Sequence, residues 1–474
     1  MKILLSRPAL LTPLDLSTAQ EPALQDFGGF LVSRCEGLKP LPSGISWHFR
    51  TRTNELLYGA ALKIEWLVEA LKQGFGAQNL AAIIGTTTTG VEENLIALRE
   101  NGRYDNAKQS HANPALFLRE FFGLKGLCYG VSNACTSGAK ALIEGARLIR
   151  AGLCKAAIVG GVDSINTLTL QGFKALSITS NAPSRAFCED RDGINIGEAA
   201  ALLVMMSEDA LKCCDERTRG EFKCELAGFA SNTDAFAMTQ PSSDLNVKKA
   251  LLDEALGVNL GENSRNLGEN SSGGVNFSQN SQENSAKFEF DENSCENSQK
   301  NSRENDEKGK MCKGFSMKNR LCGAKARLEA KRLPSPAEVI CRENPSAQAN
   351  FSDKVDYISA HGTGTKDNDR VEAEFIAAFL PNVPTSSVKP FVGHSLAACG
   401  AVEAGLCVNL ICESLQKGEA ALPPQIYENI DPAFSQSLNL ARAGEKKCVR
   451  AALSLSFAFG GDNAALYIRA FDGR

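Results

Sequence analysis

The feature that most constrains the fold is an alternation of short apolar runs with helix-like segments along the 474-residue chain. The run 156–161, Ala-Ala-Ile-Val-Gly-Gly, begins as a continuous apolar stretch, as in a strand buried on both faces of a parallel sheet. It follows the segment 136–150, in which Leu142, Ala146 and Ile149 recur at helical spacing. Further strand-like runs cover 127–131, 355–360, 452–457 and 464–469. This alternation predicts an α/β fold.

The charge and cysteine content exclude several classes of function. The formal net charge is −4 and the pI about 5.8, so neither a nucleic-acid partner nor a basic membrane-binding surface is indicated. The sixteen cysteines include no CxxC pair, and four histidines are too few for an obvious zinc cluster. Residues 1–8 make a poor signal peptide, and we expect no stretch to approach the roughly 20 apolar residues of a membrane span. We therefore expect a cytoplasmic protein with free thiols, no metal and no membrane span.

Residues 257–352 depart from the alternation. They are rich in Asn, Ser, Glu and Lys, and the tripeptide Glu-Asn-Ser recurs from Glu262, Glu269, Glu283, Glu292 and Glu296. Such a composition buries too little apolar surface to offset the entropy of ordering. We predict an inserted, largely disordered surface loop, with a partner-docking region as the alternative.

Cys135 is the candidate nucleophile. It lies in Val-Ser-Asn-Ala-Cys-Thr-Ser-Gly-Ala (131–139), between a strand-like run and a helix-like run. The unpaired N–H groups and the macrodipole at a helix N-terminus favour a thiolate. A lone cysteine is a weak signal, so the assignment depends on partners elsewhere in the chain.

Two histidines and a lysine supply such partners. His361 follows a strand-like run and opens His-Gly-Thr-Gly-Thr, where small and hydroxylated residues admit a polar ligand close to the backbone. His394 precedes a predicted helix over 395–415, a position at which an imidazole stays neutral and can donate an N–H to a developing oxyanion. These histidines and Lys389 lie near strand–helix junctions, where α/β folds place active sites.

Together these motifs resemble those of a known family. The segments 133–138, 361–365 and 389–394 resemble the three active-site motifs of the β-ketoacyl-[acyl-carrier-protein] synthases, elongating condensing enzymes with a Cys-His-His centre. Segments 191–198 and 457–463 resemble two further stretches, and all five occur in the family's order.

The resemblance implies a thiolase-like fold, in which two similar halves pack as five αβαβα layers, usually in a homodimer. The first half would be 1–230, with the nucleophile. The second would be 231–474, with the two histidines, interrupted by the insertion at 257–352. A heterodimer is the alternative assembly.

The implied reaction is a decarboxylative Claisen condensation that lengthens a fatty-acid or polyene chain by two carbons. Cys135 would hold the acyl chain, and His361 and His394 would donate hydrogen bonds to the thioester oxygen of malonyl-acyl carrier protein. Lys389 would support the histidines electrostatically, and Glu403 matches an acidic residue that the family carries on the following helix.

The remaining implied roles concern substrate binding. Thr363 and Thr365 match hydroxyls that hold the phosphopantetheine arm of the acyl carrier protein. Phe459 matches a ring that gates the acyl pocket, and its backbone N–H would join that of Cys135 in an oxyanion hole. No bound cofactor is implied, because the substrates arrive on the carrier.

The chain departs from the family pattern at several positions. Ala458 stands where a glycine is usual, Asp462 where a threonine is usual, and Ala237 where a histidine commonly precedes a Met-Thr pair. The segments 54–57, 85–90, 367–369 and 457–459 resemble the condensing enzymes of aryl-polyene-type pathways more than those of housekeeping fatty-acid synthesis. Both branches run the same reaction, and the choice between them stays open on the sequence.

Three other functions stay open on the sequence alone. A chain-length-factor-like partner shares the fold but usually lacks the nucleophile, which is present here. A thiolase needs a second cysteine near the C-terminus, and the nearest is Cys448. An interaction or scaffold protein would use the Asn/Ser/Glu-rich insertion.

Overall fold

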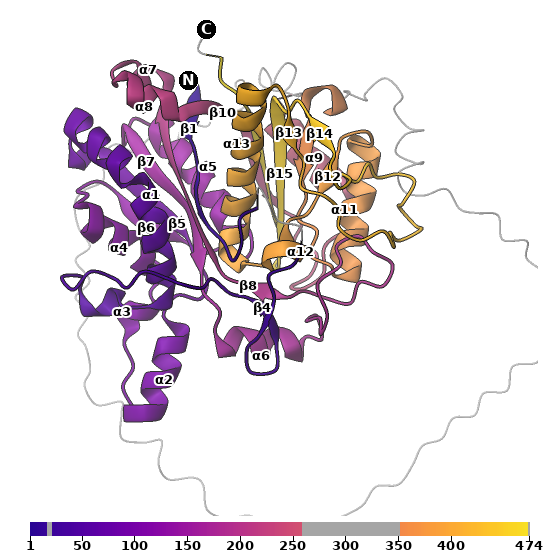
Figure 1. Ribbon diagram of the computed structural model, residues 1–474, viewed down its shortest axis with the longest axis horizontal. Coiled ribbons are helices and arrows are strands. Elements are labelled where there is room, and N and C mark those ends of the chain that lie inside the picture. The colour runs from indigo at the N-terminus through magenta and orange to yellow at the C-terminus, as the bar shows by residue number, and fades with distance from the viewer. Residues whose placement is uncertain (17–20, 258–350, 473–474) are drawn as a thin grey trace, which may run out of the picture. The chain divides into compact units, whose positions relative to one another are not determined.

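The computed structural model describes residues 1–16, 21–257 and 351–472. The prediction of a disordered loop at 257–352 falls, apart from its edges, outside the described residues. The described parts of the chain pack around one large mixed sheet with helices on its faces (Figure 1).

The main sheet has the strand order β12-β11-β15-β16-β10-β1-β9-β7-β5-β6. Its first-half strands are β1 (Ile3–Ser6), β5 (Leu80–Gly85), β6 (Cys128–Val131), β7 (Ala156–Asp163) and β9 (Ala199–Ser207). Its second-half strands are β10 (Phe222–Thr233), β11 (Tyr357–Ser359), β12 (Thr385–Ser386), β15 (Ala451–Ala458) and β16 (Asp462–Ala470). The predicted strand at 156–161 is thus confirmed as β7.

The two halves repeat one topology. Taken in chain order within each half, the second strand pairs in parallel with the third and with the fourth. These pairs are β5 with β6 and β7 in the first half, and β11 with β12 and β15 in the second half. The fifth strand pairs antiparallel with the fourth and with the first. These pairs are β9 with β7 and β1 in the first half, and β16 with β15 and β10 in the second half. β10 also pairs antiparallel with β1, and this pairing joins the two halves. β10 itself spans the predicted boundary at 230/231. The predicted thiolase-like fold with two similar halves is confirmed.

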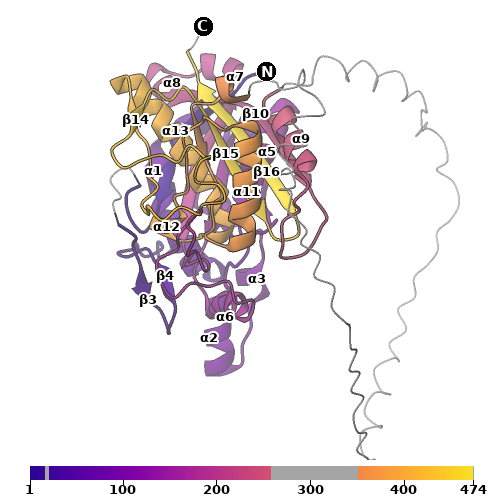
Figure 2. The ribbon, with the colours of Figure 1, turned by 90° about the vertical axis from the view of Figure 1, so that its right-hand side faces the viewer.

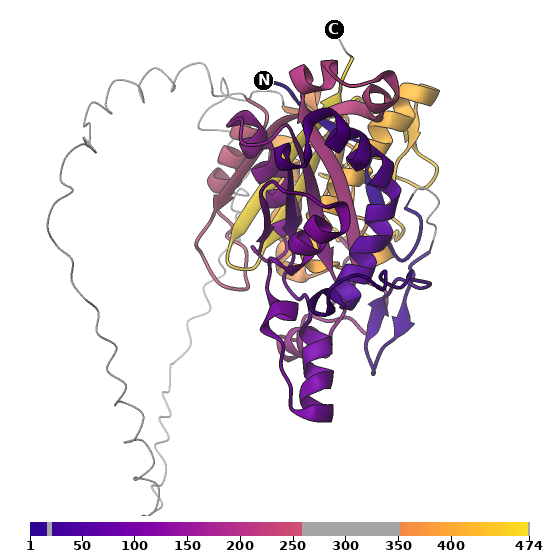
Figure 3. The same cartoon turned by 90° about the vertical axis from the view of Figure 1, so that its left-hand side faces the viewer.

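Helices complete five layers. α1 (Arg52–Phe75) and α4 (Asn113–Phe122) cover the outer face of the first half, as the indigo and purple ribbons of Figure 3 show. α9 (Leu245–Ala255) and α11 (Lys366–Phe379) cover the outer face of the second half (Figure 2). α5 (Ser137–Arg150) and α13 (Cys399–Lys417) form the middle layer and pack on each other.

The remaining elements are short or lie at the rim of the layers. The helices are α2 (Val91–Asn101), α3 (Asn106–Gln109), α6 (Thr167–Ala175), α7 (Glu208–Lys212), α8 (Glu216–Glu221) and α12 (Lys389–Val392). The 3₁₀ turns are η1 (Trp47–Phe49), η2 (Ala77–Asn79), η3 (Phe351–Lys354) and η4 (Leu396–Ala398). The strands are β2 (Ala9–Leu11), β3 (Gln25–Asp26), β4 (Leu31–Ser33), β8 (Ile196–Gly197), β13 (Ala420–Ala421) and β14 (Lys446–Lys447).

The middle layer corrects one sequence expectation. The stretch Leu396–Lys417 is long and apolar enough to cross a membrane, with a mean hydropathy of 1.5, but 89% of its apolar window is buried inside the molecule. The expectation that no stretch approaches a membrane span was therefore wrong for this segment. A helix packed between the two halves of the sheet is apolar on all sides because it has no face toward solvent.

Close approach in the middle layer requires glycine. A Cβ atom on Gly138, in the first turn of α5, would lie 2.6 Å from the carbonyl oxygen of Ala397 and 2.9 Å from the backbone nitrogen of Ala401. A Cβ on Gly161 would lie 2.7 Å from the same carbonyl oxygen. The absence of these side chains lets the turn that carries Cys135 lie against the segment that follows His394.

Candidate active site

Cys135 sits in a tight turn between β6 and α5. Ala134, just before it, has a φ of 46°, a left-handed conformation that a residue with a side chain adopts only where its surroundings enforce it. The Ser137 hydroxyl enforces it here, because it accepts from the Asn133 N–H (2.8 Å) and donates to the Ala134 carbonyl (2.6 Å). The thiol is therefore held at the start of a 14-residue helix, 9% exposed.

His361 follows β11 and is held through its backbone. The N–H groups of His361 and Gly362 each donate to the carboxylate of Glu372 on α11, both at 2.7 Å. Gly364 has a φ of 82°, and a Cβ there would lie 2.3 Å from Ser184 Oγ. The loop can take this path only with glycine at that position.

Glu372 was not predicted from the sequence. Burial raises the pKa of this carboxyl to about 8, while the two N–H groups favour its charged form. The only available signal was a pair of acidic residues, Asp369 and Glu372, three apart in the segment that forms α11. Such a pair normally indicates a solvent-facing surface rather than a buried support.

His394 follows α12 and faces His361. The Leu396 N–H donates to its Nδ1 at 3.1 Å, so Nδ1 acts as acceptor and the neutral ring carries its proton on Nε2. Cys399 Sγ lies 3.4 Å from the same Nδ1. Burial raises the pKa of the Cys399 thiol to about 11, so this sulfur stays protonated and can also donate.

Lys389 and Glu403 lie behind His361 as a buried ion pair, 2% and 1% exposed. Lys389 Nζ donates to the His361 carbonyl at 2.6 Å and lies 3.3 Å from His361 Nδ1. Burial disfavours the ammonium, but the Glu403 carboxylate more than offsets this and raises the pKa of Lys389. The ammonium then donates to Nδ1, which leaves the proton of His361 on Nε2.

The electrostatics keep His361 neutral. Burial, the Lys389 ammonium and the second histidine together hold the pKa of His361 well below its usual range. Ligand atoms of Cys135, His361 and His394 all lie within 4.8 Å of one another, and the two rings are perpendicular with centroids 5.6 Å apart. Three such atoms could hold a metal, but the adjacent buried ammonium opposes a second cation.

The three residues open onto one cavity of about 540 Å³, which Thr363, Thr365 and Phe459 also line. The two threonine hydroxyls lie 2.9 Å apart. The Phe459 ring is 36% exposed and lies 6.0 Å from the ring of Phe173 on α6. The structure thus brings six of the eight predicted site residues around one cavity and places Lys389 and Glu403 directly behind it.

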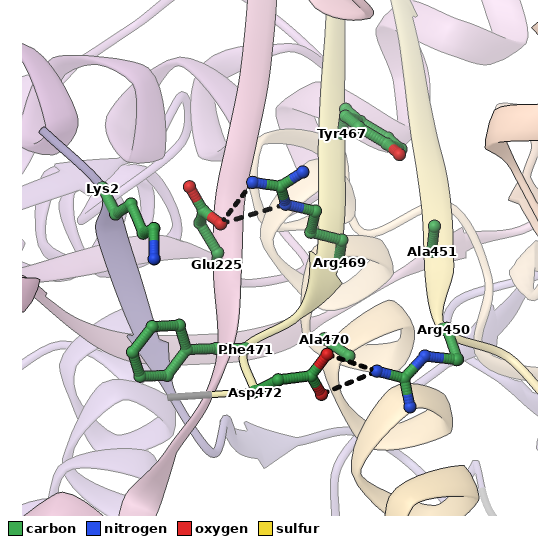
Figure 4. A pocket seen from close by; sticks show the side chains of 9 residues that line it. All are labelled: Lys2, Glu225, Arg450, Ala451, Tyr467, Arg469, Ala470, Phe471 and Asp472. Atoms are coloured by element: carbon green, nitrogen blue, oxygen red, sulfur yellow. Dashed lines mark hydrogen bonds and ion pairs between the residues drawn. The ribbon is translucent and has the colours of Figure 1, made fainter. Parts of the chain in front are cut away.

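A second cavity of about 400 Å³ lies at the other end of β16 (Figure 4). Its charged groups are paired: Arg469 with Glu225 at 2.9 Å and Arg450 with Asp472 at 2.6 Å. It contains none of the predicted site residues. The predicted site residues therefore lie at the cavity beside Cys135 and not at this one.

Asp163 is a further support that the sequence did not indicate. It ends β7, is fully buried, and accepts from the Thr86 hydroxyl (2.9 Å) and the Thr87 N–H (2.8 Å). Its other oxygen accepts from the Ala397 N–H at 2.9 Å, just beyond His394. A buried carboxylate at the end of an apolar strand thus ties the threonine-rich loop of the first half to the histidine loop of the second.

Comparison with known proteins agrees with this geometry. The family model for the β-ketoacyl synthase N-terminal domain matches residues 69–210, and that for the C-terminal domain matches 323–421. The chain is 25% identical to a putative polyketide β-ketoacyl synthase of Streptomyces cyaneus, over 94% of this chain and 88% of that protein. It is 26% identical to a putative mitochondrial 3-oxoacyl-[acyl-carrier-protein] synthase of Schizosaccharomyces pombe, over 81% and 73%.

Solved structures show the same architecture. The structure of a ketosynthase in complex with its chain length factor from Xenorhabdus doucetiae matches with a TM-score of 0.71 and 25% identity, covering 99% of this chain and 98% of that one. A β-ketoacyl synthase from Burkholderia phymatum matches with a TM-score of 0.67 at 20% identity, covering 99% of each chain.

Proposed function

Because the chain belongs to the β-ketoacyl synthase family, we propose that it condenses an acyl-enzyme thioester with malonyl-acyl carrier protein, with loss of CO₂. One observation carries the proposal: Cys135 Sγ and a ring nitrogen of each histidine lie within 4.8 Å of one another. The product is a fatty-acid or polyene chain longer by two carbons. The substrates arrive on the phosphopantetheine of an acyl carrier protein, and no bound cofactor takes part.

In the first half-reaction the Cys135 thiolate attacks the carbonyl carbon of the incoming acyl thioester. The oxyanion that forms is stabilised by the backbone N–H groups of Cys135 and Phe459. The carrier thiolate leaves and takes up a proton, and the acyl chain remains on Cys135. The hydroxyls of Thr363 and Thr365 hold the phosphopantetheine arm during the transfer.

In the second half-reaction malonyl carrier enters and its carboxylate leaves as CO₂. The electron pair of the broken C–C bond moves into an enolate, whose oxygen accepts the Nε2–H groups of His361 and His394. The enolate carbon then attacks the acyl-cysteine carbonyl, and Cys135 leaves as a thiolate. Both rings must be neutral donors with the proton on Nε2. The Leu396 N–H and the Lys389 ammonium favour that form.

The principal alternative is a non-catalytic, chain-length-factor-like partner. One solved structure that resembles this chain pairs a ketosynthase with its chain length factor. Retention of Cys135 with both histidines favours the catalytic role. We propose a homodimer, with a heterodimer as the alternative to be distinguished by native mass spectrometry of the chain expressed alone.

The test is intact-protein and peptide mass spectrometry after incubation with a mixture of saturated and aryl-polyene acyl carriers. We expect one acyl adduct, on the Cys135 peptide, and its loss in Cys135→Ala. Cys448→Ala is the matched control, because that thiol is exposed. Absence of an adduct at Cys135 in the unmodified chain would refute the proposal, and the mass of the adduct reports the acyl class.

The histidines are tested separately. His361→Ala and His394→Ala should keep the acyl adduct and lose CO₂ release from malonyl carrier. If either variant loses the adduct but keeps decarboxylation, the division of labour is wrong.

A further inference from the structure

Asp462, one of the departures from the family pattern, lies beside the nucleophile turn. It begins β16, and its carboxylate accepts from the Thr136 hydroxyl and forms an ion pair with Lys140 Nζ at 2.6 Å. The side chains of Lys140 and Asp462 are 19% and 12% exposed. Thr136 directly follows Cys135, and Lys140 lies one helical turn further along α5.

The same residue closes the glycine-rich turn. Asp462 is paired with Ala458 across the hairpin of β15 and β16, and Phe459 stands in the connection between them. Gly460 and Gly461 have φ values of 85° and 74°, so the turn has a left-handed path that suits glycine. Its shape is fixed locally, but its position relative to α5 is not. Asp462 provides that connection from the base of the hairpin.

The negative charge of Asp462 also affects the charge state of the neighbouring nucleophile. A carboxylate that is hydrogen-bonded to Thr136, the residue after Cys135, by itself opposes a negative charge on the thiol. The Lys140 ammonium compensates it. The charged or titratable groups that line the cavity beside Cys135 include His361, His394, Asp192, Asp234, Lys366 and Asp367. The ion-pair partner of Lys140 is Asp462.

We propose that the Asp462–Lys140 pair is a positioning device of the condensing site. It fixes the glycine-rich turn against the nucleophile helix, and so sets the N–H groups of Phe459 and Cys135 relative to each other. The Lys140 ammonium balances the charge of Asp462, so that Asp462 can hold the turn in place without disfavouring the Cys135 thiolate. The inference rests on the proposed function for the role of those N–H groups, but its electrostatic part concerns the thiol alone.

The electrostatic test is the rate of iodoacetamide alkylation of Cys135 at pH 7, followed on its own peptide. Asp462→Asn leaves Lys140 uncompensated, so alkylation should become faster by about threefold or more. Lys140→Met leaves Asp462 uncompensated, so alkylation should become slower by a similar factor. The double variant should return close to the rate of the unmodified chain.

Two controls separate this effect from general disruption. Glu144→Gln removes one partner of the exposed Arg147–Glu144 pair on the same helix and should leave the Cys135 rate unchanged. Thermal unfolding of each variant checks folding. If both single variants change the rate in the same direction, or if neither changes it, the electrostatic role is wrong.

The positioning test compares the two half-reactions. Asp462→Ala, which removes the acceptor from Thr136 and Lys140, should slow acyl transfer to Cys135 by about tenfold or more. CO₂ release from malonyl carrier, which depends on the histidines, should change by less than about twofold. Equal losses in both half-reactions would overturn the positioning role. Alkylation needs no condensing activity, so this inference and the proposed function can fail independently.

Discussion

Glu403→Gln is the substitution that most sharply tests the buried network behind His361. The glutamine nearly keeps the shape of glutamate but removes the charge that compensates Lys389. The Lys389 ammonium is 2% exposed and would keep only neutral acceptors, the His361 carbonyl at 2.6 Å and the His361 Nδ1 at 3.3 Å. The variant therefore leaves a buried charge without its counter-ion.

The size of the effect follows from this environment. Removing one partner of a buried pair destabilises a protein by about 3–5 kcal/mol. The retained His361 carbonyl places the expected loss at the lower end, about 3 kcal/mol. A Lys389 side chain displaced by the loss of its counter-ion no longer orients the His361 ring. Decarboxylation of malonyl carrier should then slow by about 10–100-fold.

Urea unfolding gives the free energy, and CO₂ release gives the rate. Glu413→Gln is the matched control, because that residue pairs with the exposed Lys417 on the same helix and should change stability by less than about 1 kcal/mol. Lys389→Met with Glu403→Gln should cost less than the sum of the single variants. A Glu403→Gln variant that is destabilised no more than the control would contradict a buried ion pair at this position.

Three further predictions concern the same loops. Because burial first, and its charged neighbours next, hold the pKa of His361 well below its usual range, only the unfolded state gains a proton on it below about pH 6.5. The free energy of unfolding should therefore fall by up to about 1.4 kcal/mol for each unit by which the pH drops below that value. His361→Gln should flatten this pH dependence in urea unfolding at several pH values, and an unchanged slope would contradict the prediction. Glu372→Gln should cost about 1–3 kcal/mol in the same assay, because the amide NH₂ cannot accept a hydrogen bond and then faces a backbone N–H, and an unchanged stability would contradict the double-acceptor role of this side chain. Gly138→Ala should lower the melting temperature, because the added methyl group overpacks the site at a cost of about 1–3 kcal/mol. Gly172→Ala is the control: its methyl group meets open space on a helix, so it should raise the melting temperature. Equal effects of the two variants would contradict the close approach of the two halves.

Much of the architecture could be predicted from local patterns. The apolar run at 156–161 and the helical spacing at 136–150 correspond to β7 and α5, and the predicted helix at 395–415 corresponds to η4 and α13. These elements are determined by side-chain periodicity, which is a property of neighbouring residues. The same periodicity could not distinguish a buried core helix from a membrane span, because both are apolar on all sides.

The supports of the site could not be predicted in this way. Asp163 and Glu372 are ordinary acidic residues in the sequence, and they become acceptors for backbone N–H groups only because the packed loops bring those groups to them. The burial that changes their environment comes from elements far away in the chain. Neither composition nor spacing carries that information.

By itself the sequence determined the kind of fold, the order of its motifs and the chemical types at the strand–helix junctions. Cys135, His361 and His394 could be named from those junctions. Only the tertiary structure decided that the three meet within 4.8 Å, that each ring is turned to present Nε2–H, and that Asp462 reaches Lys140 across 322 residues of chain. The physical reason is that α5 and α13 pack against each other between two half-sheets, so residues that are distant along the chain share one low-dielectric site.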